Sequence, residues 1–490
     1  MQKKFLSGLF LMLLFNVLIK PFWMLGIEVG VQNRVGEEVY GLYFVILNTT
    51  FLFNILLDFG ITNYNNRHIS QNNQLLTKQL SNTVPLKLML GVFFTVVTFF
   101  IGLLLGYNSY QFYLLGVLCF NQFLSSFILY LRSNLAALLM FKVDSLLSVL
   151  DRSLMILFCG ILLWGNVTSK PFQIEWFIYS QTSAYLITAI IALAIVLSKT
   201  SHFKLRFNRV FTISILKQSI PFAILVLLMT FYNRIDSIIM LKLLGNEEGS
   251  FYSGIYARAY RLLDSVNMLS YLFSVLLLPI FSRMLKNKDN IHRIVKLSFS
   301  LVFILAVSIA ISLSFQHFTV IDILTTNKDI VPEASHIFRV LILGFIPISF
   351  TYIFGTLLTA GGTLKQLNII AASGVLLNIV FDLIFIPHYK AMGAAWTSLT
   401  TQSVTALFQM LYAIYYFKIK VKKGYAVKLL FYTIGIILLN IILKSLSLNL
   451  FLVILIVGIA SVLLPFILRI VSFKNILNFV KTELTHKPEQ

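Results

Sequence analysis

The sequence predicts an all-α polytopic membrane protein with about fourteen transmembrane helices. Composition is the first observation behind this class: hydrophobic residues make up 58% of the 490-residue chain and charged residues 12%. Soluble domains carry about 25% charged residues. The second observation is spacing, because apolar runs of about 20 residues, the length needed to cross a bilayer, recur along the chain. The third is an alternation of basic and acidic loops.

Fourteen apolar runs are long enough to span the membrane. The first follows Lys3 and Lys4, as in a signal peptide, but no small-residue cleavage site comes after it. We therefore expect an uncleaved first helix. The predicted spans are 5–27, 38–60, 82–106, 111–132, 143–164, 173–197, 216–243, 250–279, 294–316, 334–358, 366–387, 391–417, 426–446 and 450–471.

Basic residues divide the loops into two classes. The loops of one class and the two chain ends hold most of them, including Lys3, Arg67, Arg132, Lys204, Arg206, Arg283, Lys288, Lys365, Lys420, Lys423 and Lys474. The other loops hold Arg34, Lys170, Lys328 and Lys390 among many acidic residues. Because cytoplasmic loops are enriched in Lys and Arg, both termini are predicted to be cytoplasmic. This topology accounts for the net charge of +21 without nucleic-acid binding, since no soluble segment interleaves basic and aromatic residues.

A short internal repeat groups the spans. VGEEVYGLY at 35–43 and LGNEEGSFYSGIY at 244–256 each place a Gly and an acidic pair before a Gly-aliphatic-Tyr step. Each opens an even-numbered span from the outer side, which indicates a parallel repeat about an axis along the membrane normal. The acidic residues suit the N-terminal end of a helix dipole. Gly41 and Gly254 would allow close approach of a neighbouring helix.

The repeat and the span count predict two six-helix lobes followed by two further helices. The segments are an N-terminal lobe at 1–198, a basic amphipathic cytoplasmic linker at 199–215, a C-terminal lobe at 216–420, two extra helices at 421–472 and a cytoplasmic tail at 473–490. The charge of the linker is typical of a topogenic inner loop with some affinity for anionic lipid.

Several function classes lack their sequence signals. Cys119 and Cys159 lie singly inside apolar runs and the histidines form no HxxxH or HExxH motif, so no metal site or cofactor is expected. The sequence contains no GxxxxGK[ST] motif for nucleotide hydrolysis. Loops of at most about twenty residues also disfavour a membrane glycosyltransferase or polymerase. We therefore expect a transporter, not an enzyme, driven by an ion gradient, the membrane potential or a substrate gradient.

Charged residues inside the spans are the candidate functional residues, because a charge at the bilayer centre costs about 2.5–3.5 kcal/mol on insertion scales. Arg234 lies about 25 Å of helix from Lys217 and about 16 Å from Gly245. Arg258 and Arg261 lie about 14 Å and about 18 Å into the next span. The three arginines therefore reach a similar depth on consecutive helices.

Basic residues outnumber acidic residues at this depth, which favours a water-filled cationic cavity. The candidate cavity residues are Lys20, Arg152, Arg234, Arg258 and Arg261, with simple ion pairing equally open for Arg152. A cavity of this charge suits an anionic substrate such as a phosphate, a pyrophosphate or an acidic sugar.

Acidic residues near these arginines are candidate pairing or gating residues. Asp264 follows Arg261 by three residues and can pair with it on one helix face. Asp236 lies two residues after Arg234, so it points to a different side and is expected to contact a neighbouring helix. Interhelical ion pairing or snorkelling is the simpler interpretation of the remaining charges Asp58, Lys87, Asp151 and Asp382.

Three segments resemble the polysaccharide (Wzx-type) flippases of the multidrug/oligosaccharidyl-lipid/polysaccharide exporter superfamily. They are YGLYFVILNTTFLFNILLDFGITNYNNRHIS at 40–70, PFAILVLLMTFYNRIDSIIMLKLLGNEEGSFYSGIYARAYRLLD at 221–264 and AMGAAWTSLTTQ at 391–402. The resemblance implies a two-lobed, alternating-access flippase in the bacterial cytoplasmic membrane. Its substrate would be an undecaprenyl-pyrophosphate-linked oligosaccharide for a surface polysaccharide such as an O-antigen of lipopolysaccharide. H⁺ or Na⁺ coupling and polymerase or glycosyltransferase partners would fit such a role.

Two alternatives share the same superfamily or the same charge pattern. One is a multidrug or cation antiporter, in which Asp236, Asp264 and Asp382 would bind cations. The other is a flippase of peptidoglycan lipid intermediates, which also needs a cationic cavity. The sequence leaves both open beside the polysaccharide flippase.

Overall fold

Helices form every element in the described part of the chain. The computed structural model describes residues 18–471, apart from Lys20, 63–64, 66–68, 70–72, 166, 168, 201–202, 207–208, 421 and 447. Within these residues ten helices are long and apolar enough to cross a membrane, or up to eleven with the bent pair Phe222–Arg234 and Asp236–Leu244. The all-α polytopic class is confirmed. Fourteen spans stay a prediction, because most of the first predicted span lies outside the described residues.

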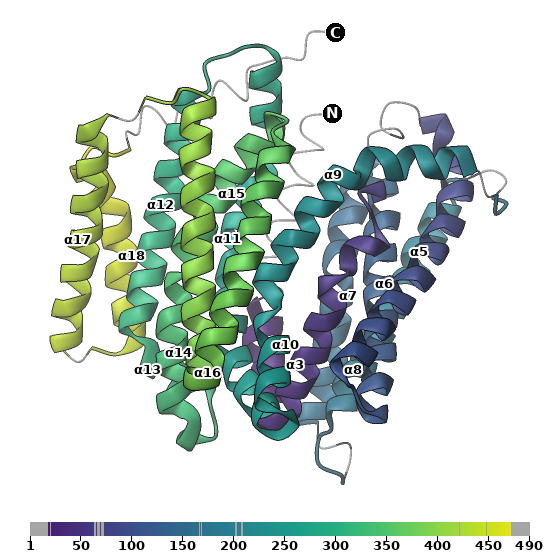
Figure 1. The fold of residues 1–490 in the computed structure, drawn as a ribbon, viewed down its shortest axis with the longest axis horizontal. Helices are drawn as coiled ribbons and strands as arrows, with labels where there is room; N and C mark the ends of the chain where they lie inside the picture. The colour runs from purple at the N-terminus through teal and green to yellow at the C-terminus, as the bar shows by residue number, and fades with distance from the viewer. Residues whose placement is uncertain are drawn as a thin grey trace. The chain divides into compact units, whose positions relative to one another are not determined.

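The chain forms two compact units. The first holds Met1–Arg258 and Val375–Ala394. Its elements are η1 (Trp23–Glu28), α2 (Val29–Val35), α3 (Glu37–Leu52), η2 (Asn54–Leu57), η3 (Asn73–Leu75), α5 (Leu76–Leu105), α6 (Ser109–Ala137), α7 (Phe141–Trp164), α8 (Ile174–Leu197), α9 (Arg209–Arg234) and α10 (Asp236–Leu244). Figure 1 shows α5, α6, α7 and α8 running side by side.

The second unit holds Ala259–Gly374 and Ala395–Gln490. Its own elements are α12 (His292–Phe315), α13 (His317–Leu324), η4 (Lys328–Ile330), α14 (Val331–Leu343), α15 (Phe345–Ala360), α17 (Lys423–Ser445) and α18 (Leu450–Ile467). Two long helices, α11 (Asn246–Lys286) and α16 (Leu364–Tyr416), contribute to both units. Both units are thus assembled from distant parts of the sequence.

These units divide the chain differently from the predicted lobes at 1–198 and 216–420. In the structure α9, α10 and the first three turns of α11 belong with the N-terminal helices. The physical reason is a dense contact between α3 and the start of α11. The two lobes therefore stay a prediction drawn from the repeat.

The element α16 contains two helices. A continuous helix of its 53 residues would extend for about 80 Å, far more than the hydrocarbon core of about 30 Å. The backbone leaves the helical conformation at Lys390, with φ 51° and ψ −128°. Since this interruption falls between the predicted spans 366–387 and 391–417, it agrees with two separate crossings.

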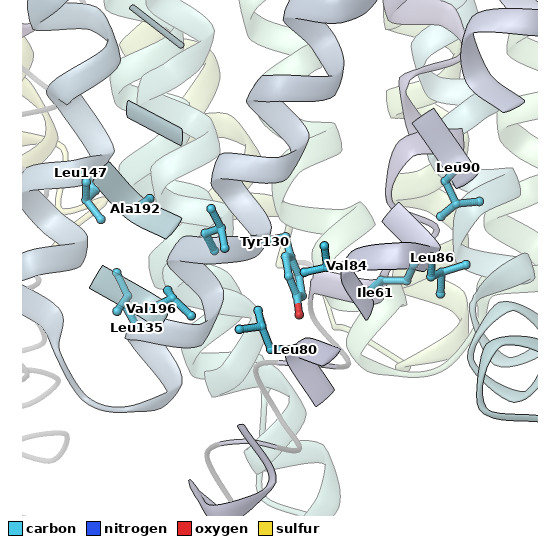
Figure 2. Packing of buried hydrophobic residues seen from close by; sticks show 11 residues of the cluster. Ile61, Leu80, Val84, Leu86, Leu90, Tyr130, Leu135, Leu147, Ala192 and Val196 are labelled. Carbon is cyan, nitrogen blue, oxygen red and sulfur yellow. The ribbon is translucent and has the colours of Figure 1, made fainter. Parts of the chain in front are cut away.

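Apolar side chains from α5, α6, α7 and α8 fill the interior of the first unit (Figure 2). One charged group lies among them: Lys87 of α5, which is 1% exposed and ion-paired with Asp58. Its ammonium group also donates hydrogen bonds to Ser126 Oγ at 3.2 Å and to the carbonyl oxygen of Leu57 at 2.9 Å. The expected interhelical pairing of Lys87 and Asp58 is therefore present.

Polar contacts attach α17 to α12 in the second unit. The contacts recur along the two helices at Ser300–Tyr425 (2.7 Å), Ser308–Tyr432 (2.6 Å) and Ser312–Asn440 (3.1 Å). Leu429, Tyr432 and Ile436 of α17 join the apolar cluster around α12 and α18. Because hydroxyl and carboxamide groups in hydrocarbon need partners, these contacts fix the register of α17 on α12.

Candidate functional site

The backbones of α3 and α11 touch at two glycines of the predicted repeat. A Cβ atom on Gly41 would lie 1.8 Å from the carbonyl oxygen of Ser250. A Cβ atom on Gly254 would lie 2.0 Å from the carbonyl oxygen of Glu37. No side chain fits at either position without separating the helices. The expected close approach at Gly41 and Gly254 is confirmed, and the neighbouring helices are those of the two repeat copies themselves.

Two further glycines give both copies the same start. Gly36 has φ 82° and ψ 171°, and Gly245 has φ 83° and ψ 177°. Each ends one helix by donating its N–H to a carbonyl four residues earlier, and the next helix begins at the following residue. Positive φ with extended ψ is accessible essentially to glycine alone. The repeat therefore reflects a shared backbone turn.

The glycine contact brings Glu37 of α3 against Arg258 of α11. Glu37 Oε1 accepts a hydrogen bond from Arg258 Nη2 at 2.5 Å, and both side chains are buried, at 6% and 2% exposed. Arg258 Nη1 donates to Asn33 Oδ1 at 2.9 Å. Gln32 Nε2 donates to the carbonyl oxygen of Gly254 at 2.9 Å. Arg258 is thus neutralised inside a helix contact in this structure, and its place on a cavity wall stays a prediction.

A break in the seventh predicted span places Asp236 at the start of a helix. The helix α9 ends at Arg234, α10 begins at Asp236, and their axes differ by 48°. Asp236 is 1% exposed. Its Oδ1 accepts a hydrogen bond from Asn378 Nδ2 at 3.0 Å and its Oδ2 accepts one from Tyr256 Oη at 2.6 Å. The expected contact of Asp236 with neighbouring helices is present, through α11 and α16.

A second buried acid lies beside Asp236. Asp382 follows Asn378 by one helical turn on α16, is fully buried, and lies close enough to Asp236 to influence its carboxyl group. Tyr256 and Asn378 carry no charge. Two neighbouring buried carboxylates repel each other unless a proton or a cation compensates them. The group of Asp236, Asp382, Asn378 and Tyr256, here called the carboxyl-pair site, therefore has the chemistry of a proton or monovalent-cation site.

Lys390 holds the α16 segment of the first unit against α11. Lys390 Nζ lies 2.6 Å from Glu248 Oε1 and donates to Tyr252 Oη at 2.9 Å. Its ammonium group also lies 4.5 Å from the centre of the Tyr252 ring. Together with the Asn378–Asp236 hydrogen bond, this contact fixes α16 at both ends of the carboxyl-pair site.

Arg152 lies in an aromatic environment inside the first unit. Its guanidinium group is 5.5 Å from the ring centre of Trp23 and 5.8 Å from that of Tyr185. Asp151 is 3.8 Å away, and 28% of the Arg152 side chain stays exposed. Arg152 is therefore held by ring faces and a distant carboxylate, and its charge is only partly compensated.

The remaining predicted site residues fall in separate places. Arg234 lies 5.4 Å from the centre of the Phe51 ring and is partly exposed. Arg261 belongs to the second unit, where Nη1 lies 3.8 Å from Asp264 Oδ2 and the two side chains are 13% and 16% exposed. The predicted pairing of Arg261 with Asp264 is thus present. Lys20 lies outside the described residues.

The comparisons with known proteins agree with this fold. A sequence profile described as polysaccharide biosynthesis protein matches residues 5–285, which is more than half of the chain. The chain belongs to the polysaccharide biosynthesis protein family. The match covers every predicted site residue from Lys20 to Asp264. A second profile, MatE, matches residues 221–384. No curated protein matches the chain.

Solved structures show the same fold for this polysaccharide biosynthesis family member. A lipid II flippase MurJ in an inward closed conformation aligns at a TM-score of 0.66 with 16% identity, covering 95% of this chain and 100% of that one. An inward-facing multidrug resistance MATE transporter of the MOP superfamily aligns at 0.62 with 16% identity, covering 81% and 94%. A Vibrio cholerae MATE transporter aligns at 0.59 with 16% identity, covering 85% and 97%. The fold is therefore that of MOP-superfamily transporters.

Several contacts of this family member were not predictable from its sequence. Asn378 and Asp382 are four residues apart and share a helix face, a signal that identifies a polar patch but not its partner. Glu37 was interpreted as a helix-end acid, although it pairs with Arg258 across 221 residues of sequence. Tyr256 lies in the repeat but carries no charge, so nothing in the sequence indicated its hydrogen bond to Asp236. Such pairings depend on tertiary contacts that a single sequence does not reveal.

The glycine contact gives a first prediction. Gly254→Ala forces an overlap with the Glu37 backbone, and overpacking costs about 1–3 kcal/mol. We expect a lower unfolding temperature of the detergent-purified protein. Gly458→Ala on α18 is the matched control, because nothing lies within 4 Å of its added Cβ. Equal unfolding temperatures for both variants would contradict the contact.

The Glu37–Arg258 pair gives a second prediction. Glu37→Gln leaves the Arg258 charge buried, and breaking such a pair costs about 3–5 kcal/mol. The double variant Glu37→Gln/Arg258→Met should recover much of this loss, measured as the free energy of unfolding. Asp322→Asn, which removes an exposed pair with Lys328, should cost only about 0–1 kcal/mol. Similar losses for Glu37→Gln and Asp322→Asn would show that the first pair is not buried in the folded protein.

Proposed function

We propose that the chain is a flippase that moves an anionic, polyprenyl-pyrophosphate-linked oligosaccharide across the bacterial cytoplasmic membrane for surface polysaccharide biosynthesis. The observation that carries this proposal is the polysaccharide biosynthesis match over residues 5–285, the segment that contains all predicted cationic site residues. The MOP-superfamily transporter fold supports transport by alternating access. The loops between the helices are too short to hold a catalytic domain, which favours transport over catalysis.

Partly exposed arginines support an anionic substrate. Arg152 and Arg261 each have a carboxylate at 3.8 Å, and part of each side chain is exposed. Arg234 also keeps part of its side chain exposed beside Phe51. A pyrophosphate accepts bidentate hydrogen bonds from guanidinium groups. We therefore assign the headgroup of the substrate to Arg152, Arg234 and Arg261, with Lys20 as a further candidate.

Arg258 is proposed to act in transport through its ion pair with Glu37. The pair joins α3 of the predicted N-terminal lobe to α11 of the predicted C-terminal lobe. Alternating access between these lobes requires that the α3–α11 contact separates at one stage. Separation would release the guanidinium group of Arg258 toward the substrate path. In this proposal Arg258 closes one end of the path in one state and binds substrate in another.

The carboxyl-pair site is proposed to couple transport to an ion. Asp236 and Asp382 are both buried and interact, and the nearby Asn378 carboxamide and Tyr256 hydroxyl are neutral ligands. A proton shared between the acids, or a Na⁺ held by them, would remove their repulsion. Tyr256 lies two residues before Arg258 on α11, so ion occupancy and the Glu37–Arg258 contact act on the same helix segment.

A multidrug or cation antiporter is the second candidate, because buried acids also suit cation binding. The MatE match at 221–384 includes the whole carboxyl-pair site. Reconstituted vesicles distinguish the two functions. Drug-dependent proton or sodium flux would support the antiporter, whereas translocation of a fluorescent polyprenyl-pyrophosphate glycan would support the flippase. A lipid II substrate in the same assay would identify the third alternative, a peptidoglycan precursor flippase.

The arginine assignment predicts a transport defect. Arg152→Gln, Arg234→Gln and Arg261→Gln each remove charge-assisted hydrogen bonds worth about 1.5–3 kcal/mol, so glycan export should fall about tenfold or more. The measurement is surface polysaccharide, together with lipid-linked oligosaccharide left on the inner leaflet. Arg283→Gln is the control, because Arg283 is an exposed arginine near the end of α11. Normal export in all three variants would refute the assignment.

The coupling assignment predicts a loss of ion dependence. Asp236→Asn and Asp382→Asn remove the ionisable groups of the carboxyl-pair site while keeping their size. Transport in proteoliposomes should then no longer respond to an imposed pH or Na⁺ gradient, whereas the exposed-loop variant Asp289→Asn should respond like the wild type. The gradient that drives the wild type identifies the ion. A full response in both buried variants would place coupling elsewhere.

A further inference from the structure

Four basic side chains gather at one end of the second unit. His317 is the first residue of α13, which follows α12 after a single residue. His336 and Arg339 lie on α14, and Lys444 lies in the last turn of α17. The ring centres of His317 and His336 are 5.5 Å apart. The group of His317, His336, Arg339 and Lys444 is called the basic corner below.

Hydrogen bonds between the helices hold the basic corner together. Asn440 Nδ2 donates to Ser312 Oγ at 3.1 Å, one turn before Lys444 on α17. Ser314 Oγ donates to the carbonyl oxygen of Arg339 at 3.4 Å. These two contacts sit in the last turn of α12, directly before His317. The end of α12 therefore holds α14 and α17 in place, and Arg339 and Lys444 lie close enough to His317 to lower its pKa.

The cations of the basic corner lie close to one another. Burial, together with Arg339, His336 and Lys444, lowers the pKa of His317 to about 4. Within the described residues, neither Arg339 nor Lys444 forms an ion pair with a carboxylate. The nearby acid Asp322 pairs with Lys328 instead. His317 Nδ1 is enclosed and has no hydrogen-bond partner in the described structure. An enclosed ring nitrogen without a hydrogen-bond partner thus lies beside these cations.

We propose that the basic corner is a binding site for a phosphate group. A guanidinium group offers two parallel N–H donors to phosphate oxygens, and an ammonium group adds a point charge. Imidazole beside a bound dianion or diester becomes protonated and supplies a further donor. The corner lies where spanning helices end, at the depth of lipid headgroups. Two sources therefore share the chemistry: the phosphodiester of an anionic lipid, and a free phosphate in solution.

The site is separate from the proposed substrate path. None of its four residues belongs to the arginine set or to the carboxyl-pair site. On the topology that the loop charges predict, the α12–α13 turn and the end of α17 lie on the outer face. A phosphate bound there would link α13, α14 and α17 by one shared ligand and would stabilise the second unit.

Binding to the full-length, detergent-purified protein tests the proposal. Two probes are used. Binding of phosphatidylglycerol is measured by native mass spectrometry, and binding of inorganic phosphate is measured by the shift in unfolding temperature. The double variant Arg339→Gln/Lys444→Gln should bind the active probe about tenfold more weakly or worse. Lys328→Gln is the matched control, since it removes one exposed lysine near the same helix ends. Lipid binding alone identifies a headgroup site, and a shift with phosphate alone identifies a soluble ligand.

A second variant distinguishes a loss of phosphate binding from a folding defect. His336 is exposed, so His336→Asn should leave the unfolding temperature of the ligand-free protein unchanged while weakening binding of the same probe. The proposal is overturned if neither probe binds the wild type. It is equally overturned if the double variant and Lys328→Gln bind alike. These readouts measure binding and not transport, so they stand apart from the test of the flippase function.

Discussion

Direct contact between the backbones of α3 and α11 is the constraint on which the first unit depends. Helices in hydrocarbon gain little from burying apolar side chains, so close van der Waals packing and interhelical hydrogen bonds hold them together. Gly41 and Gly254 permit that packing. It brings Glu37 to Arg258, and it carries Tyr256 on the same stretch of α11 toward Asp236. A salt bridge and a candidate ion site thus both follow from the absence of two side chains.

The interior charges separate into two kinds by how they are compensated. Lys87 and Arg258 are almost fully buried, and each has a carboxylate in direct contact and further polar partners. Arg152 and Arg261 each have a carboxylate at 3.8 Å and keep exposed surface. A fully desolvated charge needs a close counter-charge, whereas a partly hydrated one does not. The second kind is therefore the better place to bind a charged substrate.

Much of the fold was predictable because each bilayer crossing leaves a local signal in the sequence. Runs of apolar residues mark both ends of α7, α8 and α12 to within two residues, and the glycines of the repeat mark a close helix contact. The site was less predictable. Depth along a helix places Arg234 beside Arg258 and Arg261, yet the structure pairs Arg258 with an acid 221 residues away. Asp382 was expected to form an interhelical ion pair or to snorkel, whereas in the structure it is fully buried near Asp236. Helical periodicity gives the face of a residue, and only tertiary packing gives its partner.

Two backbone interruptions lie on the helices that carry the carboxyl-pair site, at Ile235 and at Lys390. Within a bilayer, free backbone groups are tolerated only where protein or water can satisfy them. The break at Ile235 starts a new helix at Asp236, and an acidic group at a helix N-terminus is stabilised by the helix dipole. Asn378 and Asp382 lie on the segment of α16 that precedes the interruption at Lys390, and Asn378 Nδ2 donates to Asp236 Oδ1 at 3.0 Å. The break at Ile235 therefore places the acid at a helix start, and the α16 segment supplies the amide that binds it.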